Sequence, residues 1–361
     1  MKKAIIILLC VTVAGGMLTG CSSNPTSTEA PAEAIEDAAD AANTANVADT
    51  ADAANTADAA NTDAGGLVTV GFSQVGAESD WRVANTASMK EALSEENGYK
   101  LIIDDAQQEQ KKQIKAVRDF ISREVDVIVI APVKETGWET VLGEARDAGI
   151  PVIIVDRMIN VSDDTLYTCW VGSDFENEGV EAARWLVNYM EEQGKGDDKH
   201  NIVVLRGTIG SSAEIGRTKG FSDTIAAYGN YEIVGRQTGD FTQAKGREVM
   251  ESFLEEFDNI DVVISQNDNM AFGAIDALKA AGKVPGSEVV IVSFDAVKAA
   301  FKSMIAGDMN VSVECNPLHG PRVAELVDKI MNGEEVEKIQ YVEESVYAAD
   351  TAKEDLLGRQ Y

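Results

Sequence analysis

From Gly66 onward, the sequence alternates between short runs of apolar, often β-branched residues and longer amphipathic stretches. The short runs are typical of buried strands and the longer stretches of helices, so the alternation predicts βαβ units around parallel sheets. Strands are expected at residues 67–72, 100–103, 125–130, 151–155, 201–205, 231–234, 261–264 and 289–294. Helices are expected at residues 81–93, 108–122, 138–148, 176–190, 215–227, 244–257, 270–281 and 297–305, with Gly149 and Gly282 placed as C-terminal caps.

These elements form two sets of four units, one before and one after the segment 167–174. The division favours an α/β fold of two doubly wound parallel-sheet lobes over a closed eight-stranded barrel, which remains the alternative. Three further elements exceed the simple repeat of a barrel: a strand at 311–314, a helix at 322–331 and a strand at 340–347.

The N-terminus has the organisation of an export signal. Lys2 and Lys3 precede an apolar run at residues 5–13 that is too short to span a bilayer, and small residues then lead to Cys21. The stretch Leu18-Thr19-Gly20-Cys21 resembles a bacterial lipobox, which implies a signal peptide at 1–20 and a lipid such as palmitate on Cys21. We therefore predict an extracytoplasmic protein anchored to the cell membrane by lipid; an ordinary secretory signal before a chance cysteine is the alternative.

The stretch 21–66 has a different composition, dominated by Ala, Asn, Thr and Asp. It holds nine acidic residues, no Lys, Arg or aromatic residue, and the hexad Ala-Asp-Ala-Ala-Asn-Thr at 39–44, 51–56 and 57–62. Such a segment cannot bury enough apolar surface to offset the entropy of ordering it. It is predicted to be a disordered acidic linker, kept extended by its like charges.

The net charge of −30 argues against a nucleic-acid partner, because phosphate binding needs a basic face. Four cysteines are present, and after Cys10 in the leader and Cys21 at the lipid site, only Cys169 and Cys315 belong to the fold. A disulfide between these two cysteines can form in an exported protein. Both lie in strand-like segments, however, where a free buried thiol is the more common finding and the preferred interpretation.

Polar residues follow many of the predicted strands. Ser73 follows the first strand, Asp156 and Arg157 the fourth, Asn267 the seventh and Asp295 the eighth. In open parallel sheets, ligands bind outside the carboxyl ends of the strands, so these side chains are candidates for a ligand site between the lobes. For any single residue, capping of the following helix is an equally good interpretation.

A mixture of carboxylates, guanidinium groups and amides suits a neutral polyhydroxylated ligand. Carboxylates accept hydrogen bonds from sugar hydroxyls, Arg and Asn donate to them, and an aromatic face can stack on the sugar ring. Trp81 and Phe241, each beside polar residues, are the aromatic candidates.

Catalytic and metal-binding signatures are missing from the sequence. His200 and His319 are the only histidines, and neither stands in a recognisable acid–base setting. No nucleotide-binding or nucleophile motif occurs, and no Cys or His pair has metal-ligand spacing. The prediction is a binding protein, with no catalytic residue, cofactor or metal.

Several short motifs resemble those of type I periplasmic sugar-binding proteins, the ribose- and galactose-binding group of ABC importers. Within that group the sequence most resembles the galactofuranose-binding members, over essentially 67–361. The motifs are VGFSQVG at 70–76, ES at 78–79, WR at 81–82, IAPV at 130–133, TGW at 136–138, GDFT at 239–242, NDNM at 267–270 and DTAKE at 350–354.

The resemblance implies that Asp156, Arg157, Arg217, Asn267 and Asp295 form hydrogen bonds to a monosaccharide. It places Trp81 and Arg82 at the first helix, where related binders have aromatic residues, and Phe241 as a ring that stacks on the sugar from the other lobe. Related ribose binders use a glutamine near the second crossing between the lobes. Glu314 is the expected equivalent, with an uncertainty of about one residue. The complete predicted ligand-binding set is Ser73, Glu78, Trp81, Arg82, Asp156, Arg157, Arg217, Phe241, Asn267, Asp295 and Glu314.

The resemblance also implies a monomeric two-lobe clamp. The N-terminal lobe would comprise 67–173 with 316–340, and the C-terminal lobe 174–315 with 341–361. A three-segment hinge, with crossings near Ser173, Glu314 and Gln340, would let a galactofuranose-like sugar bind between the lobes and favour the closed form. That form would dock on an ABC permease in the membrane.

Other functions stay open at this stage. The same binder could report sugar occupancy to a membrane kinase or chemoreceptor, or take another aldose such as ribose or galactose. A sugar-processing enzyme on a barrel would need a catalytic pair. A cytoplasmic repressor is disfavoured, because the leader stands where a DNA-binding head would be.

Overall fold

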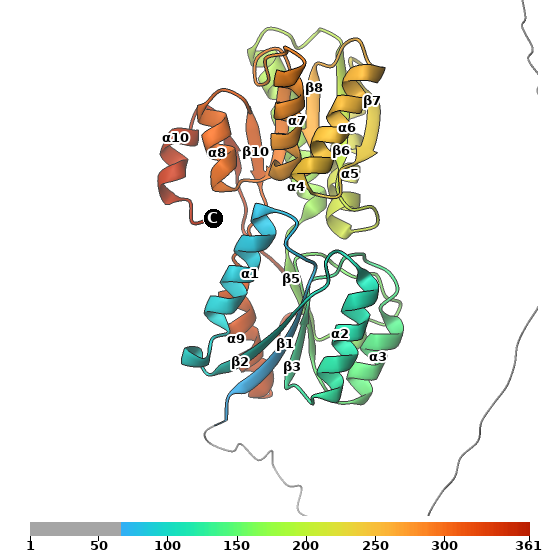
Figure 1. The fold of residues 1–361 in the computed structure, drawn as a ribbon, viewed down its shortest axis with the longest axis vertical. Helices are drawn as coiled ribbons and strands as arrows, with labels where there is room; N and C mark the ends of the chain where they lie inside the picture. Colours follow the sequence, from blue (N-terminus) through green and yellow to red (C-terminus); the bar gives the residue numbers. More distant parts are fainter. Residues whose placement is uncertain (1–65) are drawn as a thin grey trace, which may run out of the picture. The chain divides into compact units, whose positions relative to one another are not determined.

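Two mainly parallel sheets of six strands carry the fold, and helices cover both faces of each sheet (Figure 1). The computed structural model describes residues 66–361; the predicted signal peptide, the lipid site Cys21 and nearly all of the predicted linker lie outside the described residues. Among residues 66–361, no helix combines the length and apolar character that a membrane crossing requires.

The first sheet has the strand order β11-β5-β4-β3-β1-β2, with every pair parallel. Its strands are β1 (Val68–Gln74), β2 (Tyr99–Asp105), β3 (Val127–Ile130), β4 (Val152–Val155), β5 (Cys169–Gly172) and β11 (Ile339–Tyr341). Its helices are α1 (Asp80–Ala92), α2 (Gln110–Ser122), α3 (Glu139–Asp147) and α9 (Gly320–Met331), with short 3-10 turns at Glu95–Asn97 and Asp164–Leu166.

Successive residues of β3 point to opposite faces of this sheet. Val127 and Val129 belong to the core beneath α1 and α9, whereas Ile128 and Ile130 belong to the core beneath α2 and α3. Because both faces are covered, the strand is an unbroken apolar run and not an alternating one.

The second sheet has the order β12-β10-β9-β8-β6-β7, in which only β12 is antiparallel to its neighbour. Its strands are β6 (His200–Arg206), β7 (Tyr231–Thr238), β8 (Val262–Ser265), β9 (Val290–Asp295), β10 (Val311–Glu314) and β12 (Val346–Ala348). Its helices are α4 (Phe175–Glu192), α5 (Ser212–Ile225), α6 (Gln243–Glu256), α7 (Asp268–Ala280), α8 (Lys298–Ile305) and α10 (Ala352–Asp355), followed by a 3-10 turn at Leu356–Gly358.

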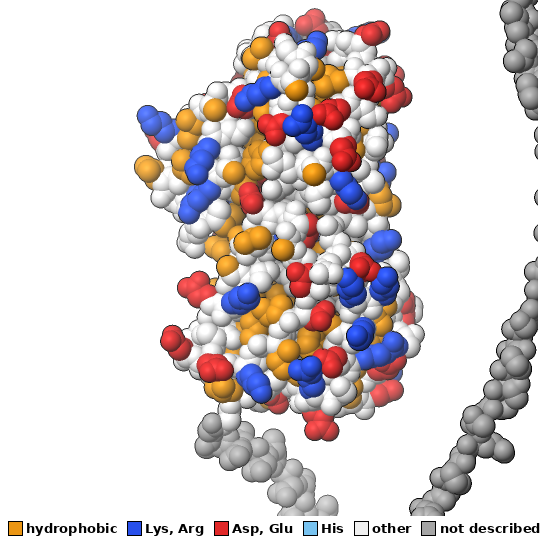
Figure 2. Space-filling view, in the orientation of Figure 1, with side chains coloured by type: hydrophobic (Ala, Val, Ile, Leu, Met, Phe, Trp, Pro, Cys, Tyr) orange, Lys and Arg blue, Asp and Glu red, His pale blue; other side chains and the backbone are white. Residues whose placement is uncertain are grey.

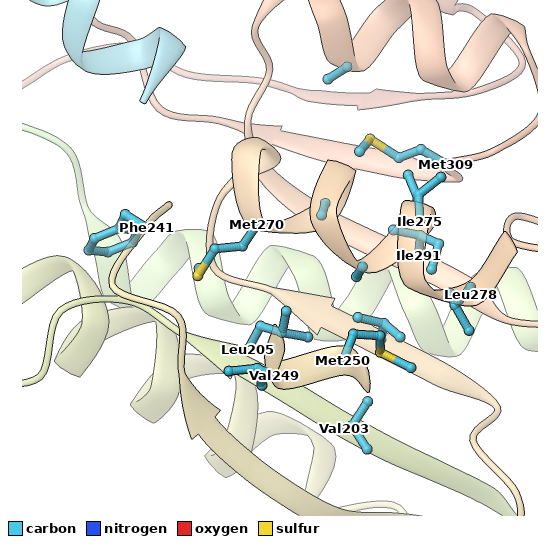
Figure 3. Close-up of a cluster of buried hydrophobic side chains, with 14 of the residues drawn as sticks. Val203, Leu205, Phe241, Val249, Met250, Met270, Ile275, Leu278, Ile291 and Met309 are labelled. Carbon is cyan, nitrogen blue, oxygen red and sulfur yellow. The ribbon is translucent and has the colours of Figure 1, made fainter. Parts of the chain in front are cut away.

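A cluster of buried apolar side chains joins this sheet to α6, α7 and α8 (Figure 3). Val203 and Leu205 of β6 pack there with Met250 of α6 and Leu278 of α7. Phe241 belongs to the same cluster, so core packing holds the position of this ring.

The fold prediction is confirmed: the structure has two α/β lobes and no closed barrel. The eight predicted strands and eight predicted helices all occur, with ends displaced by a few residues. Gly149 and Gly282 follow helices with φ of 74° and 75°, as C-terminal caps require. The predicted strand at 340–347 is wrong, because the segment forms two short strands, β11 and β12, in different sheets.

The chain passes between the sheets three times. The passages lie between β5 and α4, between β10 and α9, and between β11 and β12. β11 extends to Tyr341, one residue beyond the predicted lobe boundary at 340. The lobe boundaries themselves remain a prediction.

Helices α4 and α5 approach each other closely through glycines. A Cβ atom on Gly220 of α5 would lie 1.9 Å from the carbonyl oxygen of Glu176, and one on Gly179 of α4 would lie 2.5 Å from that of Arg217. Real Cβ atoms do not approach backbone this closely, so only glycine allows this packing. The contact positions Arg217, which faces the candidate site described next.

Acidic and basic side chains are interspersed over the face of the described residues seen in Figure 2, with apolar side chains between them. This view contains no broad region of positive charge of the kind that binds phosphate backbones.

Candidate functional site

A small cavity of about 20 Å³ lies between the carboxyl ends of the two sheets. Nine of the eleven predicted ligand-binding residues line it: Glu78, Trp81, Arg82, Asp156, Arg157, Arg217, Phe241, Asn267 and Asp295. Ser79, Phe175, Ala213 and Cys315 complete the lining and were not predicted. This space holds about one water molecule, so a larger ligand requires its lining to move apart.

Arg82 organises the wall formed by the first sheet. It is 2% exposed, and its guanidinium donates to Glu78 Oε1 at 3.1 Å, to Gln74 Oε1 at 3.3 Å and to Asp156 Oδ2 at 2.8 Å. Burial alone would lower the pKa of Arg82, but the charges of Asp156 and Glu78 outweigh it and raise the pKa. Arg82 therefore stays charged and fixes both carboxylates.

Asp156 directly follows β4 and has a left-handed backbone with φ of 61°. Burial would raise the pKa of its carboxyl, but the positive charges of Arg82 and Arg157 lower the pKa overall. The side chain is thus an ionised acceptor in the cavity wall, suited to a ligand hydroxyl.

Arg157 links the two walls of the cavity. Its guanidinium lies 3.7 Å from Glu78 Oε1 and 5.0 Å from the centre of the Phe241 ring, which belongs to the second lobe. Burial, together with the charge of Arg82, lowers the pKa of Arg157 to about 10. The group remains a cation at neutral pH and closes the cavity against the aromatic ring.

Arg217 is the central group of the wall formed by the second lobe. Its Nε donates to Glu178 Oε2 at 2.5 Å, its Nη1 donates to the Gln266 carbonyl at 2.5 Å, and its Nη2 lies 3.6 Å from Asp295 Oδ1. Burial would lower the pKa of Arg217, but the carboxylates raise it. Burial also raises the pKa of Glu178 to about 7 and raises that of Asp295 well above its ordinary value.

Asn267 caps the helix that follows it, which was the alternative interpretation of its position in the sequence. As N-cap of α7, its side-chain oxygen accepts a hydrogen bond from the Met270 N–H at 3.0 Å, and its amide donates to the Phe241 carbonyl at 3.1 Å. Asn267 nevertheless lines the cavity, so one side chain caps the helix and holds Phe241 in place.

Trp81 is held by a long-range contact. Its indole N–H donates to the Cys315 carbonyl at 2.6 Å, and the guanidinium carbon of Arg82 lies 4.5 Å from its ring centre. The ring is 4% exposed, so the hydrogen bond sets which face of the indole borders the cavity.

Ser73 and Glu314 are placed outside the cavity, which corrects two of the predicted positions. Ser73 is fully buried inside the first lobe. Glu314 faces the C-terminal segment, where it accepts from Tyr361 Oη at 2.8 Å and pairs with Arg359 at 2.8 Å. Successive residues of an extended chain point to opposite sides, so Cys315, one residue further on, lines the cavity instead.

Glu178 was not predicted from the sequence as a site residue, although its carboxylate accepts a hydrogen bond from Arg217. It stands in the first turn of α4, where an acidic residue is ordinarily explained by the helix dipole. Phe175 was missed for a similar reason, since an aromatic residue in an amphipathic helix predicts core packing. Nothing in the local sequence distinguishes either residue from those common cases.

The cavity lining holds equal numbers of arginines and carboxyl groups. Three arginines, Arg82, Arg157 and Arg217, oppose three carboxylates, Glu78, Asp156 and Asp295. With both donors and acceptors present, the cavity favours a ligand rich in hydroxyl groups. An anionic ligand would leave the carboxylates unpaired.

Further contacts join the lobes around the cavity. The Asp80 N–H donates to Asn269 Oδ1 at 3.0 Å, the Met158 N–H to Ser212 Oγ at 2.8 Å, and the Glu135 N–H to the Gly210 carbonyl at 3.0 Å. The structure is therefore a closed form, in which groups of both lobes meet.

Cys169 and Cys315 are both free and buried. This is the interpretation that the sequence preferred over a disulfide.

His319 predicts a specific pH dependence of stability. It is 1% exposed, and burial lowers its pKa from 6.5 to about 4. Between these pH values the unfolded chain binds a proton that the folded chain does not, so the free energy of unfolding falls as the pH falls. We expect this residue to cost roughly 2 to 3 kcal/mol over that window.

His319→Asn keeps an acceptor for the Asn85 amide, which lies 3.3 Å from His319 Nδ1, and removes the titration. Urea unfolding at pH 8, 6, 5 and 4 should give a flatter profile for this variant than for the wild type. Parallel profiles would mean that His319 does not titrate in this way.

Two doubly wound lobes, three passages between them and a polar cavity at the carboxyl ends of both sheets define a type I periplasmic binding protein. Residues 70–335 match the family described as periplasmic binding protein domain, and the chain belongs to this family. Members of this kind bind solutes and are not enzymes, in agreement with the prediction of a binding protein.

Individual relatives are similar over most of their length. The galactofuranose-binding protein YtfQ of Escherichia coli (strain K12) is 45% identical over 293 residues, which cover 80% of this chain and 90% of YtfQ. A protein from Mycobacterium smegmatis in complex with β-D-fucofuranose is 44% identical with a TM-score of 0.79, covering 82% of this chain and 96% of that one. The periplasmic binding protein of the arabinose ABC transporter from Shewanella sp. ANA-3, bound to L-arabinofuranose, is 44% identical with a TM-score of 0.76, covering 81% and 95%.

Proposed function

We propose that this protein is the lipid-anchored solute-binding component of an ABC sugar importer, and that its ligand is a monosaccharide in the furanose form, galactofuranose or a close relative. The observation that carries the proposal is the cavity lining, in which arginines and carboxyl groups stand beside the aromatic residues Trp81 and Phe241. Such a lining pairs with hydroxyl groups on the edge of a sugar and with apolar C–H groups on its face.

The relatives support the furanose assignment. Three of them, at 44 or 45% identity, are described with galactofuranose, β-D-fucofuranose or L-arabinofuranose. A furanose ring places its exocyclic carbons and hydroxyls differently from a pyranose, and a buried polar group left without its hydroxyl costs about 1 to 3 kcal/mol. A cavity built for one ring form therefore discriminates against the other.

A titration tests the ligand directly. Trp81 lines the cavity, so intrinsic tryptophan fluorescence and thermal shift should report binding of one sugar per chain. Galactofuranose, fucofuranose and arabinofuranose should give saturable responses, whereas ribopyranose, galactopyranose and glucopyranose should bind more weakly. Tight binding of a pyranose with no response to any furanose would overturn the ligand assignment.

We propose that closure about the three passages couples binding to transport. The lobes would comprise 67–173 with 316–340 and 174–315 with 341–361. Hydrogen bonds between the lobes form only in the closed state, so they shift the equilibrium toward it together with the sugar. The closed form would then present surfaces of both lobes to a membrane permease.

The contacts outside the cavity yield a prediction. Ser212→Ala and Asn269→Ala should each weaken sugar binding by roughly 2- to 10-fold, because each removes one hydrogen bond that exists only on closure. Calorimetric titration measures the effect. Ser122→Ala is the control, since the Ser122 hydroxyl donates only to the nearby Asp119 carbonyl at 2.9 Å; equal losses in all three variants would contradict the closure model.

The anchor is separable from the binding site. Cys21→Ala should release the protein from the membrane fraction and leave sugar affinity unchanged. Permease and ATPase genes beside this one, and loss of sugar uptake when they are deleted, would support import. Unchanged uptake, with sugar-dependent signalling through a kinase or chemoreceptor, would favour the sensing alternative.

A further inference from the structure

Three side chains from different passages between the lobes meet beside the sugar cavity. Glu178 stands in the first turn of α4 after the first passage, Cys315 follows β10 at the second, and Glu344 lies between β11 and β12 at the third. One potential ligand atom from each, a thiol sulfur and two carboxylate oxygens, lies within 4.8 Å of the others.

Glu344 also connects the passages by hydrogen bonds. Its Oε1 accepts from Ser173 Oγ at 2.5 Å and from the Asn316 N–H at 2.8 Å. Ser173 Oγ in turn lies 3.3 Å from Cys315 Sγ. The three groups are therefore held in place by the hinge segments themselves.

Among the described residues, Arg217 is the one positive partner of the cluster's acidic groups, and it contacts a single oxygen of Glu178. Arg217 pairs with Glu178 Oε2, but Glu178 Oε1 is buried without a hydrogen-bond partner, and the side chain is 2% exposed. Glu178 does not line the sugar cavity, so a bound sugar does not supply that partner. Among the salt bridges of residues 66–361, none involves Glu344. A buried oxygen left in this state points to a missing cation or water.

We propose that Glu178, Cys315 and Glu344 form a binding site for a divalent, thiophilic metal ion of the zinc class. A cysteine sulfur and two carboxylate oxygens are accepted zinc ligands, and Ser173 Oγ or a water can complete a four-coordinate site. Sequence spacing predicted no metal, because the three ligands stand 137 and 29 residues apart and only the hinge brings them together.

Because the site lies where the three passages meet, a bound ion would affect the relative position of the lobes. An ion held by residues from all three passages ties the hinge segments together and stabilises the form in which they are close. The ion has a route to the site, because Glu344 is only partly buried and its neighbours Glu343 and Ser345 are exposed.

Cobalt and zinc titrations of the full-length chain test the site. Co²⁺ should bind with a stoichiometry of one and give the near-ultraviolet charge-transfer band of a cobalt–thiolate bond, and Zn²⁺ should displace it and raise the melting temperature. Cys315→Ser should abolish the band, and Glu344→Gln should weaken Zn²⁺ binding more than about 100-fold, since even outer-shell partners contribute 10- to 100-fold. Cys169→Ser and Glu343→Gln are the matched controls and should behave as the wild type.

Absence of a stoichiometric cobalt–thiolate band in the wild-type chain overturns the proposal without any variant. Binding that survives in Cys315→Ser also overturns it. Glu344→Gln preserves an oxygen acceptor for Ser173 and Asn316, and thermal melting without metal checks that it folds. The sugar titration needs no metal, so failure of this site and failure of the furanose assignment are seen separately.

Discussion

Asp156→Ala is expected to weaken sugar binding by at least about 100-fold while the protein stays folded. Asp156 Oδ2 lies 2.8 Å from Arg82 Nη2 and 3.9 Å from Arg157 Nε, and all three side chains are buried. Removing the carboxylate leaves Glu78 as the one carboxylate that contacts both guanidinium groups, so two buried cations share a single buried anion. Breaking such a buried charge pair costs about 3 to 5 kcal/mol, and the ligand loses an ionised acceptor as well.

Calorimetric titration measures the loss, and two further variants interpret it. Asp156→Asn keeps the shape and tolerates the left-handed backbone, so it separates loss of charge from backbone strain; it too should bind weakly. Asp104→Ala removes a carboxylate at the end of β2 that does not line the cavity, and should bind normally. Normal affinity in both Asp156 variants would mean that the ligand binds elsewhere.

Gly220→Val is expected to lower the free energy of unfolding by at least about 4 kcal/mol. A Cβ at this position would lie 1.9 Å from the Glu176 carbonyl oxygen and 2.9 Å from the Val180 nitrogen. Both atoms are backbone, so no side-chain rotation relieves the clash, and α4 and α5 must separate. Their separation would also disturb Arg217 and Glu178, which lie on these two helices.

Gly143→Ala is the matched control for the helix-packing prediction. Gly143 lies inside α3, and a Cβ there has no atom within 4 Å. The alanine should raise stability by roughly 0.5 to 1 kcal/mol, because it reduces the freedom of the unfolded chain and favours the helix. Urea unfolding of both variants measures the contrast; equal stability of Gly220→Val and the wild type would show that the helices can move apart at little cost.

Part of the candidate site was predictable because its signals are local. Asp156 and Asp295 directly follow or end apolar runs, and the carboxyl ends of parallel strands are where such folds bind ligands. Both residues line the cavity. Arg82 and Arg217 lie on helices, where an arginine has many ordinary explanations, and only the family resemblance singled them out.

Other positions depended on side-chain direction, which a sequence pattern does not give to within one residue. Glu314 was expected in the site, but Cys315 lines the cavity and Glu314 pairs with the C-terminal segment. A shift of one residue in an extended segment reverses the side on which the side chain lies. Ser73 likewise follows the expected apolar run, yet its side chain is enclosed within its own lobe.

By itself, the sequence determined the alternation of strands and helices, the division into two lobes and the polar character of the strand ends, because each follows from the order of residues within one segment. The tertiary structure alone decided which distant groups meet. Glu178 with Arg217, Trp81 with the Cys315 carbonyl, and Cys315 with Glu344 are contacts between segments far apart in the chain. Such contacts depend on how two sheets and three passages pack together, and that packing is a property of the whole chain and not of any one segment.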